Sequence, residues 1–302
     1  MLNFVKRVGI LILTNAFIML GLYIVIYLIE RFTGTNITWN ADIMSLLVYG
    51  FVLGMGWSIV SLFMSKSMAK SMYGMKMLDR DNKHNYDDKI QVFMDVVRKV
   101  AESKWISLPE LWIYKSPDPN AFATWSSKNN SLVAVSIGLL DNMNEEQISG
   151  VIWHEMAHVY NGDMVTMTLL QGIMNTFVFF LSRVIGVIRS SKDREWPIWY
   201  NPVMSFILEI VFGITATLII SRFSQYREFR ADAGSAKTLW KQSMISALQQ
   251  LKYITEGRSR AQNDQFSTMK INGGGGWLAR LFATHPSLDR RIVRLQEMRV
   301  EM

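Results

Sequence analysis

Residues 144–162 read NEEQISGVIWHEMAHVYNG, which contains a helix-start signal and a pair of histidines four residues apart. Asn144, with two acidic residues and Gln147 after it, has the form of a capping box, so a helix is expected to start there and to run through His158. Most positions between them are apolar, which is typical of a helix packed into a core. His154 and His158 would lie on one face of that helix, about one turn apart.

The histidine pair encloses Glu155 in the pattern HEMAH, residues 154–158. Two imidazoles at this spacing can bind one Zn²⁺, and the carboxylate beside the first can take a proton from the attacking water and pass it to the leaving amine. The pattern also arises by chance on surface helices. Chance is disfavoured because the chain has only 4 histidines and because unpartnered polar side chains are costly on an apolar helix. We predict one Zn²⁺ per chain, with His154 and His158 as ligands and Glu155 as the catalytic base.

A catalytic zinc needs a third protein ligand and one open position. The chain has no cysteines, and the metzincin pattern fails because it requires histidine where Met164 stands. The later glutamates that remain as candidates are Glu195, Glu209, Glu228 and Glu256.

Glu228 is the favoured third ligand because it follows an apolar hairpin that returns the chain to the side on which it left. Asp232 lies one helical turn later, where it could accept a hydrogen bond from a zinc-bound imidazole. The alternative is that Glu228 and Asp232 form an ordinary surface pair that balances the nearby arginines.

The chain has the composition of a membrane protein, since 50% of its residues are hydrophobic and its mean hydropathy is positive. Arg183 and Glu209 lie inside apolar runs and should face the bundle, an aqueous cavity or each other, because charge is costly at membrane depth. Whether the third and fourth runs span fully or form a shallow hairpin is left open by the basic loop between them. The apolar runs long enough to cross a bilayer are residues 8–29, 43–64, 165–188 and 202–220.

The net charge of +7 is spread along the chain, which fits an anionic lipid surface better than a nucleic acid. Lys6 and Arg7 precede the first apolar run, and several basic residues follow the second, whereas Arg31 alone lies in the short loop between them. Positive residues favour the cytoplasmic side of a membrane. The sequence therefore predicts a multi-pass membrane protein whose catalytic domain faces the cytoplasm.

These features predict a mainly α fold with a small β-sheet and about four membrane helices. Residues 1–64 would form two membrane helices and residues 164–221 a membrane hairpin. Residues 65–163 and 222–302 would form the two parts of a zincin-like catalytic domain of the gluzincin type.

Within the predicted catalytic domain, hydrophobic periodicity and turn residues place several elements. We expect a helix at 89–102, strands at 110–114 and 132–137, and an amphipathic helix from 222 to about 253. The stretch 258–276, which ends in four glycines, is expected to be flexible.

The order of segments resembles that of the HtpX-type membrane zinc proteases and their relatives, the prenyl-protein CaaX endopeptidases. The resemblance covers essentially the whole chain: two leading apolar segments, HEMAH, an apolar hairpin, EFRAD at 228–232 and ATHPS at 283–287. It implies Zn²⁺, the cytoplasmic (inner) membrane, cleavage of membrane proteins in quality control under envelope stress, and frequent self-cleavage.

The resemblance also implies roles for residues that the spacing alone does not assign. The stretch Asn120, Ala121, Phe122 and Ala123 would lie at the cleft. His285 would stabilise the oxyanion with help from Arg290 or Arg291, whose positive charge suits a developing tetrahedral intermediate. Taken alone, a histidine before proline is more often a turn residue.

Three other functions compete with this hypothesis. A CaaX-type prenyl protease is expected to need more membrane helices than are available here. A non-catalytic membrane scaffold that retains a zinc site would have no use for Glu155, which is present. An intramembrane serine protease is disfavoured because the Gly-Trp-Ser sequence at 56–58 has no histidine partner inside an apolar run.

The expected partners are the bilayer and unfolded or membrane-protein polypeptides, with no nucleic acid. A peptidase that accepts many sequences can hold its substrate by main-chain pairing to a sheet edge. Either Asn120–Thr124 or Leu132–Ile137 is expected to supply that edge.

Overall fold

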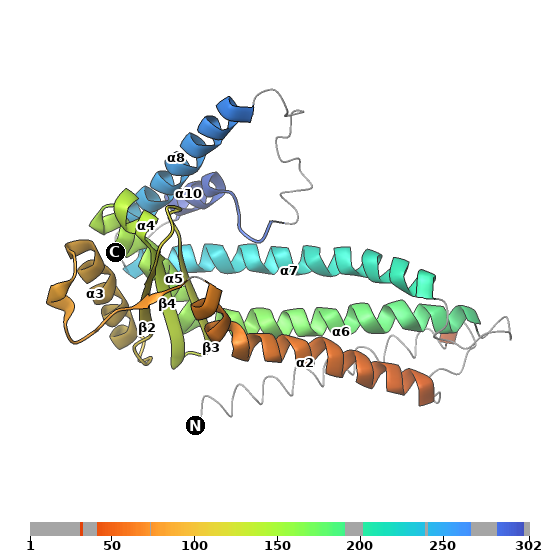
Figure 1. Ribbon diagram of the computed structural model, residues 1–302. Coiled ribbons are helices and arrows are strands. Elements are labelled where there is room, and N and C mark those ends of the chain that lie inside the picture. Colours follow the sequence, from red (N-terminus) through yellow and green to blue (C-terminus); the bar gives the residue numbers. More distant parts are fainter. Residues whose placement is uncertain are drawn as a thin grey trace. The chain divides into compact units, whose positions relative to one another are not determined.

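The computed structural model describes residues 31–32, 41–72, 74–190, 202–238, 241–266 and 283–298. Within these residues the chain is mainly helical with one small sheet, as predicted (Figure 1). It divides into two compact units, one of residues 1–61 and 167–220 and the other of residues 62–166 and 221–302. The first predicted membrane segment, residues 8–29, and the glycine run at 273–276 lie outside the described residues.

Three long apolar helices contribute to the first unit: α2 (Ala41–Met72), α6 (Asp163–Ser190) and α7 (Pro202–Thr238). Among the described residues, 3 stretches are long and apolar enough to cross a membrane, namely Leu46–Ser71, Asp163–Val184 and Met204–Lys237. They match the second, third and fourth predicted runs. Arg183 and Glu209 form an ion pair of 2.5 Å, which confirms that these two charges face each other.

Helices α2 and α6 pack closely at glycine positions. A Cβ added to Gly54 would lie 2.6 Å from the backbone nitrogen of Thr176, and one added to Gly172 would lie 2.7 Å from the sulfur of Met55. No side chain fits at such distances, so these two glycines allow the helix axes to approach. The face of α6 that carries Gly172 and Thr176 is therefore used for packing against α2.

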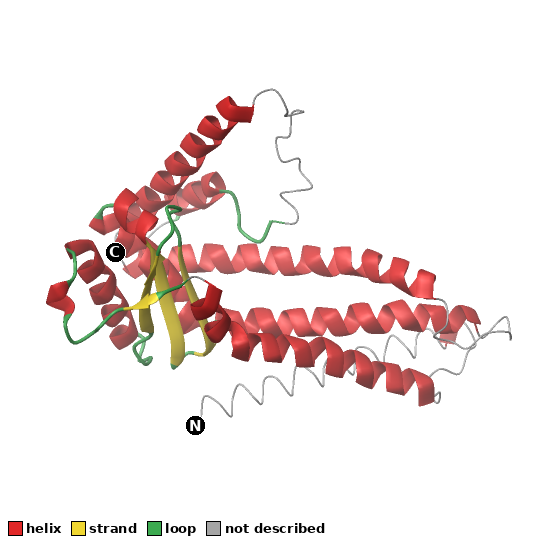
Figure 2. Cartoon of the chain, in the orientation of Figure 1, coloured by secondary structure: helices red, strands yellow, loops and turns green. Residues whose placement is uncertain are grey.

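The second unit contains the sheet, whose strands are drawn in yellow in Figure 2. The strand order is β1-β2-β4-β3, and β4 runs parallel to β2 and antiparallel to β3. The bounds are β1 (Lys76–Met77), β2 (Glu110–Tyr114), β3 (Ala121–Ser127) and β4 (Asn130–Ser136).

The predicted strands at 110–114 and 132–137 correspond to β2 and β4. Because β4 lies between β2 and β3, Leu132–Ile137 cannot supply a sheet edge, and that alternative was wrong. Asn120–Thr124 instead covers the start of β3, which is an edge strand in the described part of the sheet.

Helix α5 (Glu145–Asn161) begins at the predicted capping box, in which the Asn144 and Gln147 side chains bond each other's backbone N–H groups. It ends at Gly162, whose φ of 73° is a left-handed conformation that favours glycine. The helix packs with α3 (Asp88–Ser103) and the sheet around fully buried Phe93 and Trp153. The short η1 (Lys83–Asn85) and α4 (Ile137–Asn142) complete this part. A buried, well-capped helix thus carries the histidine pair.

The C-terminal part differs from the expected single amphipathic helix at 222–253. Helix α7 continues without a break from its membrane segment to Thr238, and α8 (Lys241–Phe266) follows. The predicted flexible stretch at 258–276 is therefore helical as far as Phe266. Helix α10 (Leu288–Glu297) packs on α8 through Ile292 and Leu295.

Candidate metal centre

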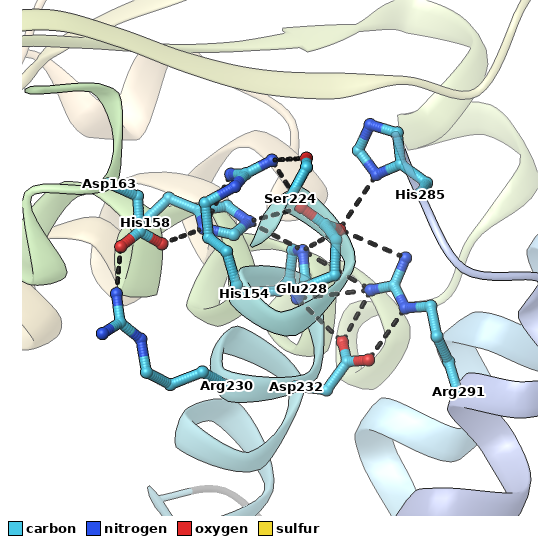
Figure 3. Close-up of polar contacts among 10 residues, drawn as sticks. His154, His158, Asp163, Ser224, Glu228, Arg230, Asp232, His285 and Arg291 are labelled. Atoms are coloured by element: carbon cyan, nitrogen blue, oxygen red, sulfur yellow. Dashed lines mark hydrogen bonds and ion pairs between the residues drawn. The ribbon is translucent and has the colours of Figure 1, made fainter. Parts of the chain in front are cut away.

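Helices α5 and α7 bring three ligand groups together (Figure 3). His154 Nε2 lies 3.4 Å from one carboxylate oxygen of Glu228, and His158 Nε2 lies 3.3 Å from the other. The two Nε2 atoms are 3.2 Å apart, and suitable ligand atoms of all three residues lie within 4.8 Å of one another. All three side chains are buried, so this is an enclosed cluster with a donor set that could hold a metal ion.

Two further carboxylates fix the imidazole rings. Asp232 lies 2.8 Å from His154 Nδ1, and Asp163 lies 2.7 Å from His158 Nδ1. Since a carboxylate only accepts, each Nδ1 donates its proton outward, and in a neutral ring Nε2 is left as an acceptor.

The inner acceptors fit a cation. With both rings neutral, two Nε2 lone pairs and the Glu228 carboxylate converge, which is unfavourable unless a positive charge, a proton or a metal ion, lies between them. Glu228 Oε1 is also a buried atom without a hydrogen bond of good geometry among the described residues, although Arg227 Nη2 lies 2.8 Å away. Two imidazoles and one carboxylate form a donor set typical of catalytic zinc.

Arginines neutralise the buried carboxylates around the cluster. Arg291 donates to Asp232 through Nε at 2.8 Å and through Nη2 at 2.6 Å. Arg230 pairs with Asp163, and Arg227 pairs with Glu228. Each carboxylate thus has at least one guanidinium partner, which makes the burial of three acidic groups energetically tolerable.

The electrostatic setting of His154 favours positive charge. Burial and the nearby Arg291 lower the pKa of His154, but its hydrogen bonds with Asp232 and Glu228 outweigh both and raise the pKa to about 9. The ring therefore lies where either a proton or a metal cation is stabilised.

The remaining predicted residues occupy different surroundings. Glu155 follows His154 on α5 but is partly exposed, unlike the two buried histidines on either side of it. His285 lies in the loop before α10 with 63% of its side chain exposed, and its Nδ1 is 3.0 Å from Glu228 Oε2. Arg291 is buried at the cluster, whereas Arg290 is exposed and lies over the Phe229 ring at 6.0 Å. The structure thus brings Arg291, and not Arg290, to the site.

Strand β3 contacts α5, the helix that carries the histidines. Asn120, just before the strand, bonds Ser136 of β4 through both its N–H and its C=O. Trp125 N–H points the other way and donates to the sulfur of Met164 at 3.4 Å. Because strand residues alternate in direction, Ala121 and Ala123 also direct their backbone groups away from β4.

Asp163 was missed in the sequence. It follows Gly162, the left-handed residue that ends α5, and is the first residue of α6. The signal available in the sequence was a carboxylate five positions after His158, just beyond a glycine expected to end the helix. Arg227 and Arg230 were treated only as nearby positive charge, although both contact the cluster.

Comparison with known proteins agrees with this geometry. Residues 89–299 match peptidase family M48. The protein named Protease HtpX from Actinobacillus pleuropneumoniae serotype 5b (strain L20) is 43% identical over 97% of this chain and 99% of its own length. Protease HtpX from Pasteurella multocida (strain Pm70) is 46% identical over 85% of this chain and 88% of its own length.

A solved structure has the same fold. The crystal structure of S. mikatae Ste24p matches with a TM-score of 0.56 and 18% identity, over 94% of this chain and 66% of that chain. The protein is thus a membrane-bound metalloendopeptidase, with three candidate membrane helices in its described part and a His/His/Glu cluster that could hold its metal. Its match to the family across most of its length and its near full-length relatives show that the chain belongs to peptidase family M48.

Proposed function

We propose that this protein is a zinc endopeptidase that cleaves misfolded or damaged membrane proteins and other unfolded polypeptides. The convergence of His154, His158 and Glu228, with Asp232 and Asp163 behind the two rings, carries the proposal. Outer carboxylates of this kind fix ring orientation and raise ligand basicity in zinc sites. The relatives named Protease HtpX support a proteolytic role.

In this proposal His154, His158 and Glu228 hold one Zn²⁺, which when bound would polarise the scissile carbonyl and the attacking water. Glu155 takes a proton from that water and later delivers it to the leaving amine. Arg291 is a positioning residue, because its two hydrogen bonds hold Asp232 against His154. His285 is exposed beside Glu228, and in its protonated form it donates toward the oxyanion.

Zinc content and casein cleavage, measured for the wild-type protein beside Glu155→Ala, test this proposal. The wild-type protein should hold about one zinc per chain and cleave casein, and removing the metal with a chelator should abolish cleavage. A wild-type protein that cleaves casein equally well with and without bound metal would contradict the zinc mechanism.

We expect proline at position 123 to block substrate binding, because the substrate is proposed to pair with the edge of β3. Proline removes the Ala123 N–H, which points away from β4, so the sheet itself keeps its hydrogen bonds. Losing a main-chain bond to substrate should raise KM about tenfold or more while zinc stays bound. The measurement is casein cleavage kinetics with zinc content.

The matched control is Thr124→Pro, which removes an N–H directed to β4 and should lower thermal stability instead. Unchanged KM in a folded, zinc-loaded Ala123→Pro protein would rule out substrate pairing at this edge.

We infer that the protein lies in the cytoplasmic membrane with β3 and the metal cluster on the cytoplasmic side, because basic residues flank the first two apolar runs on that side. Single cysteines at positions 36 and 127 of this cysteine-free chain test the orientation with an impermeant thiol reagent on intact cells. Position 36 should react, and position 127 should react only after lysis. Reaction of position 127 from outside would overturn the orientation.

A further inference from the structure

Helices α6 and α7 border an open cavity of about 230 Å³ within the first unit, lined by both polar and apolar residues. This cavity, called here the α6–α7 groove, lies in stretches apolar enough to cross a membrane. Its lining residues are Gln171, Asn175, Val178, Phe179, Glu209, Gly213, Ala216, Thr217 and Ile220. Polar side chains are costly at membrane depth and usually mark a site that binds something polar.

The groove offers both hydrogen-bond donors and acceptors. Gln171 donates one amide proton to Asn175 Oδ1 at 2.9 Å. Within the described residues this bond leaves Gln171 Oε1 as an acceptor and Asn175 Nδ2 as a donor. Glu209 is held by Arg183, so one carboxylate oxygen is fixed beside the same cavity. A donor and an acceptor on neighbouring helical turns match the N–H and C=O groups of a peptide.

The other faces of these helices have different partners. α6 packs on α2 through Gly172 and Thr176. α7 exposes a row of large apolar side chains suited to lipid: Phe206, Ile207, Ile210, Val211, Ile214 and Ile219. The Glu209 carboxylate is explained by its ion pair with Arg183, whereas neither the packing on α2 nor lipid contact explains the two carboxamides that line the groove.

We propose that the α6–α7 groove binds the main chain of a transmembrane substrate segment that has partly unwound; this rests on the proposed endopeptidase function. A peptidase needs its substrate extended, yet an unwound segment in lipid exposes N–H and C=O groups at high cost. The groove carboxamides replace the lost helix hydrogen bonds. Both groove helices also continue the active-site elements, since α6 follows α5 after one residue, Gly162, and α7 carries Glu228.

The test uses the enzyme in lipid vesicles and one cleavable reporter peptide in two forms. One form is free in solution, and the other is joined to a transmembrane segment with an Asn-Pro pair at its centre. Gln171→Leu combined with Asn175→Leu keeps apolar bulk and removes both amides. We expect kcat/KM of this double variant for the membrane-joined reporter to fall about tenfold, which is the effect of losing two hydrogen bonds in a membrane. Its kcat/KM for the free reporter should stay within about twofold of the wild-type value.

A matched pair of threonines serves as the control. Thr215 and Thr217 are both exposed and both donate to a carbonyl of their own helix, but only Thr217 lines the groove. Thr217→Val should reduce cleavage of the membrane-joined reporter more than Thr215→Val does.

Three results would overturn the groove proposal: unchanged cleavage of both reporters, an equal loss on both, or equal effects of the two threonine variants. If the wild-type enzyme cleaves neither reporter, the endopeptidase proposal itself fails, so the two failures are distinguishable.

Discussion

The Glu155→Ala protein should bind zinc as the wild-type protein does and cleave casein about 10²- to 10⁴-fold more slowly, the range for loss of a general base. Zinc retention is expected because the ligand atoms come from His154, His158 and Glu228, all of which keep their outer partners. Glu155 is partly exposed, so truncating it leaves no cavity in the core. Metal analysis and steady-state kinetics on the same preparation check both halves of the prediction.

Glu145→Ala is the matched control, since Glu145 is an exposed glutamate in the first turn of the same helix. It should cleave within about twofold of wild type, as surface substitutions usually do. A Glu155→Ala protein that keeps wild-type kcat would eliminate Glu155 as the base. Loss of zinc in that variant would instead show that Glu155 is needed for metal binding.

Replacing Glu228 should have the largest effect on metal binding. Glu228→Gln keeps the side-chain size but removes the charge that faces both imidazoles. Zinc should therefore bind at least about 100-fold more weakly, a larger loss than is usual when a residue that only hydrogen-bonds a metal ligand is replaced. Cleavage should then be lost at ordinary zinc concentrations. Zinc titration followed by calorimetry, with circular dichroism to confirm folding, measures the change.

Asp163→Asn provides the comparison for Glu228→Gln. It leaves all three ligands in place and weakens only the hold on His158 Nδ1, so its zinc affinity should fall about 10- to 100-fold. The ligand assignment is wrong if Glu228→Gln binds zinc as tightly as Asp163→Asn or holds a full equivalent and cleaves normally.

Local sequence patterns predicted those features of the site that are set by the geometry of a single helix. The capping box at Asn144 and the four-residue spacing of His154 and His158 are properties of α5 alone. Glu228 was also found from the sequence, because an apolar hairpin must bring the chain back to the side on which it left. The structure places these three side chains together because their positions depend on the period of one helix and on the return of one hairpin, both of which can be read from the chain itself.

The sequence did not reveal features that depend on how elements meet. The end of β3, residues 125–127, lies outside every strand or sheet edge expected from the sequence, and only pairing with β4 makes it part of a strand. Arg290 and Arg291 are adjacent and chemically equal, and the packing of α10 decides that Arg291 reaches Asp232. Asp163 reaches His158 only because Gly162 turns the chain sharply between two helices.

The metal cluster combines residues that are made at different times. A ribosome synthesises the two histidines and Asp163 first, then the remainder of α6, then α7 with Glu228 and Asp232, and only near the end the arginine that holds Asp232. On the proposed assignment, a nascent chain has no complete ligand set until α6 and the part of α7 that carries Glu228 have been made. On the proposed ligand assignment, hydrolytic activity is therefore first possible in a chain that already contains α6 and α7.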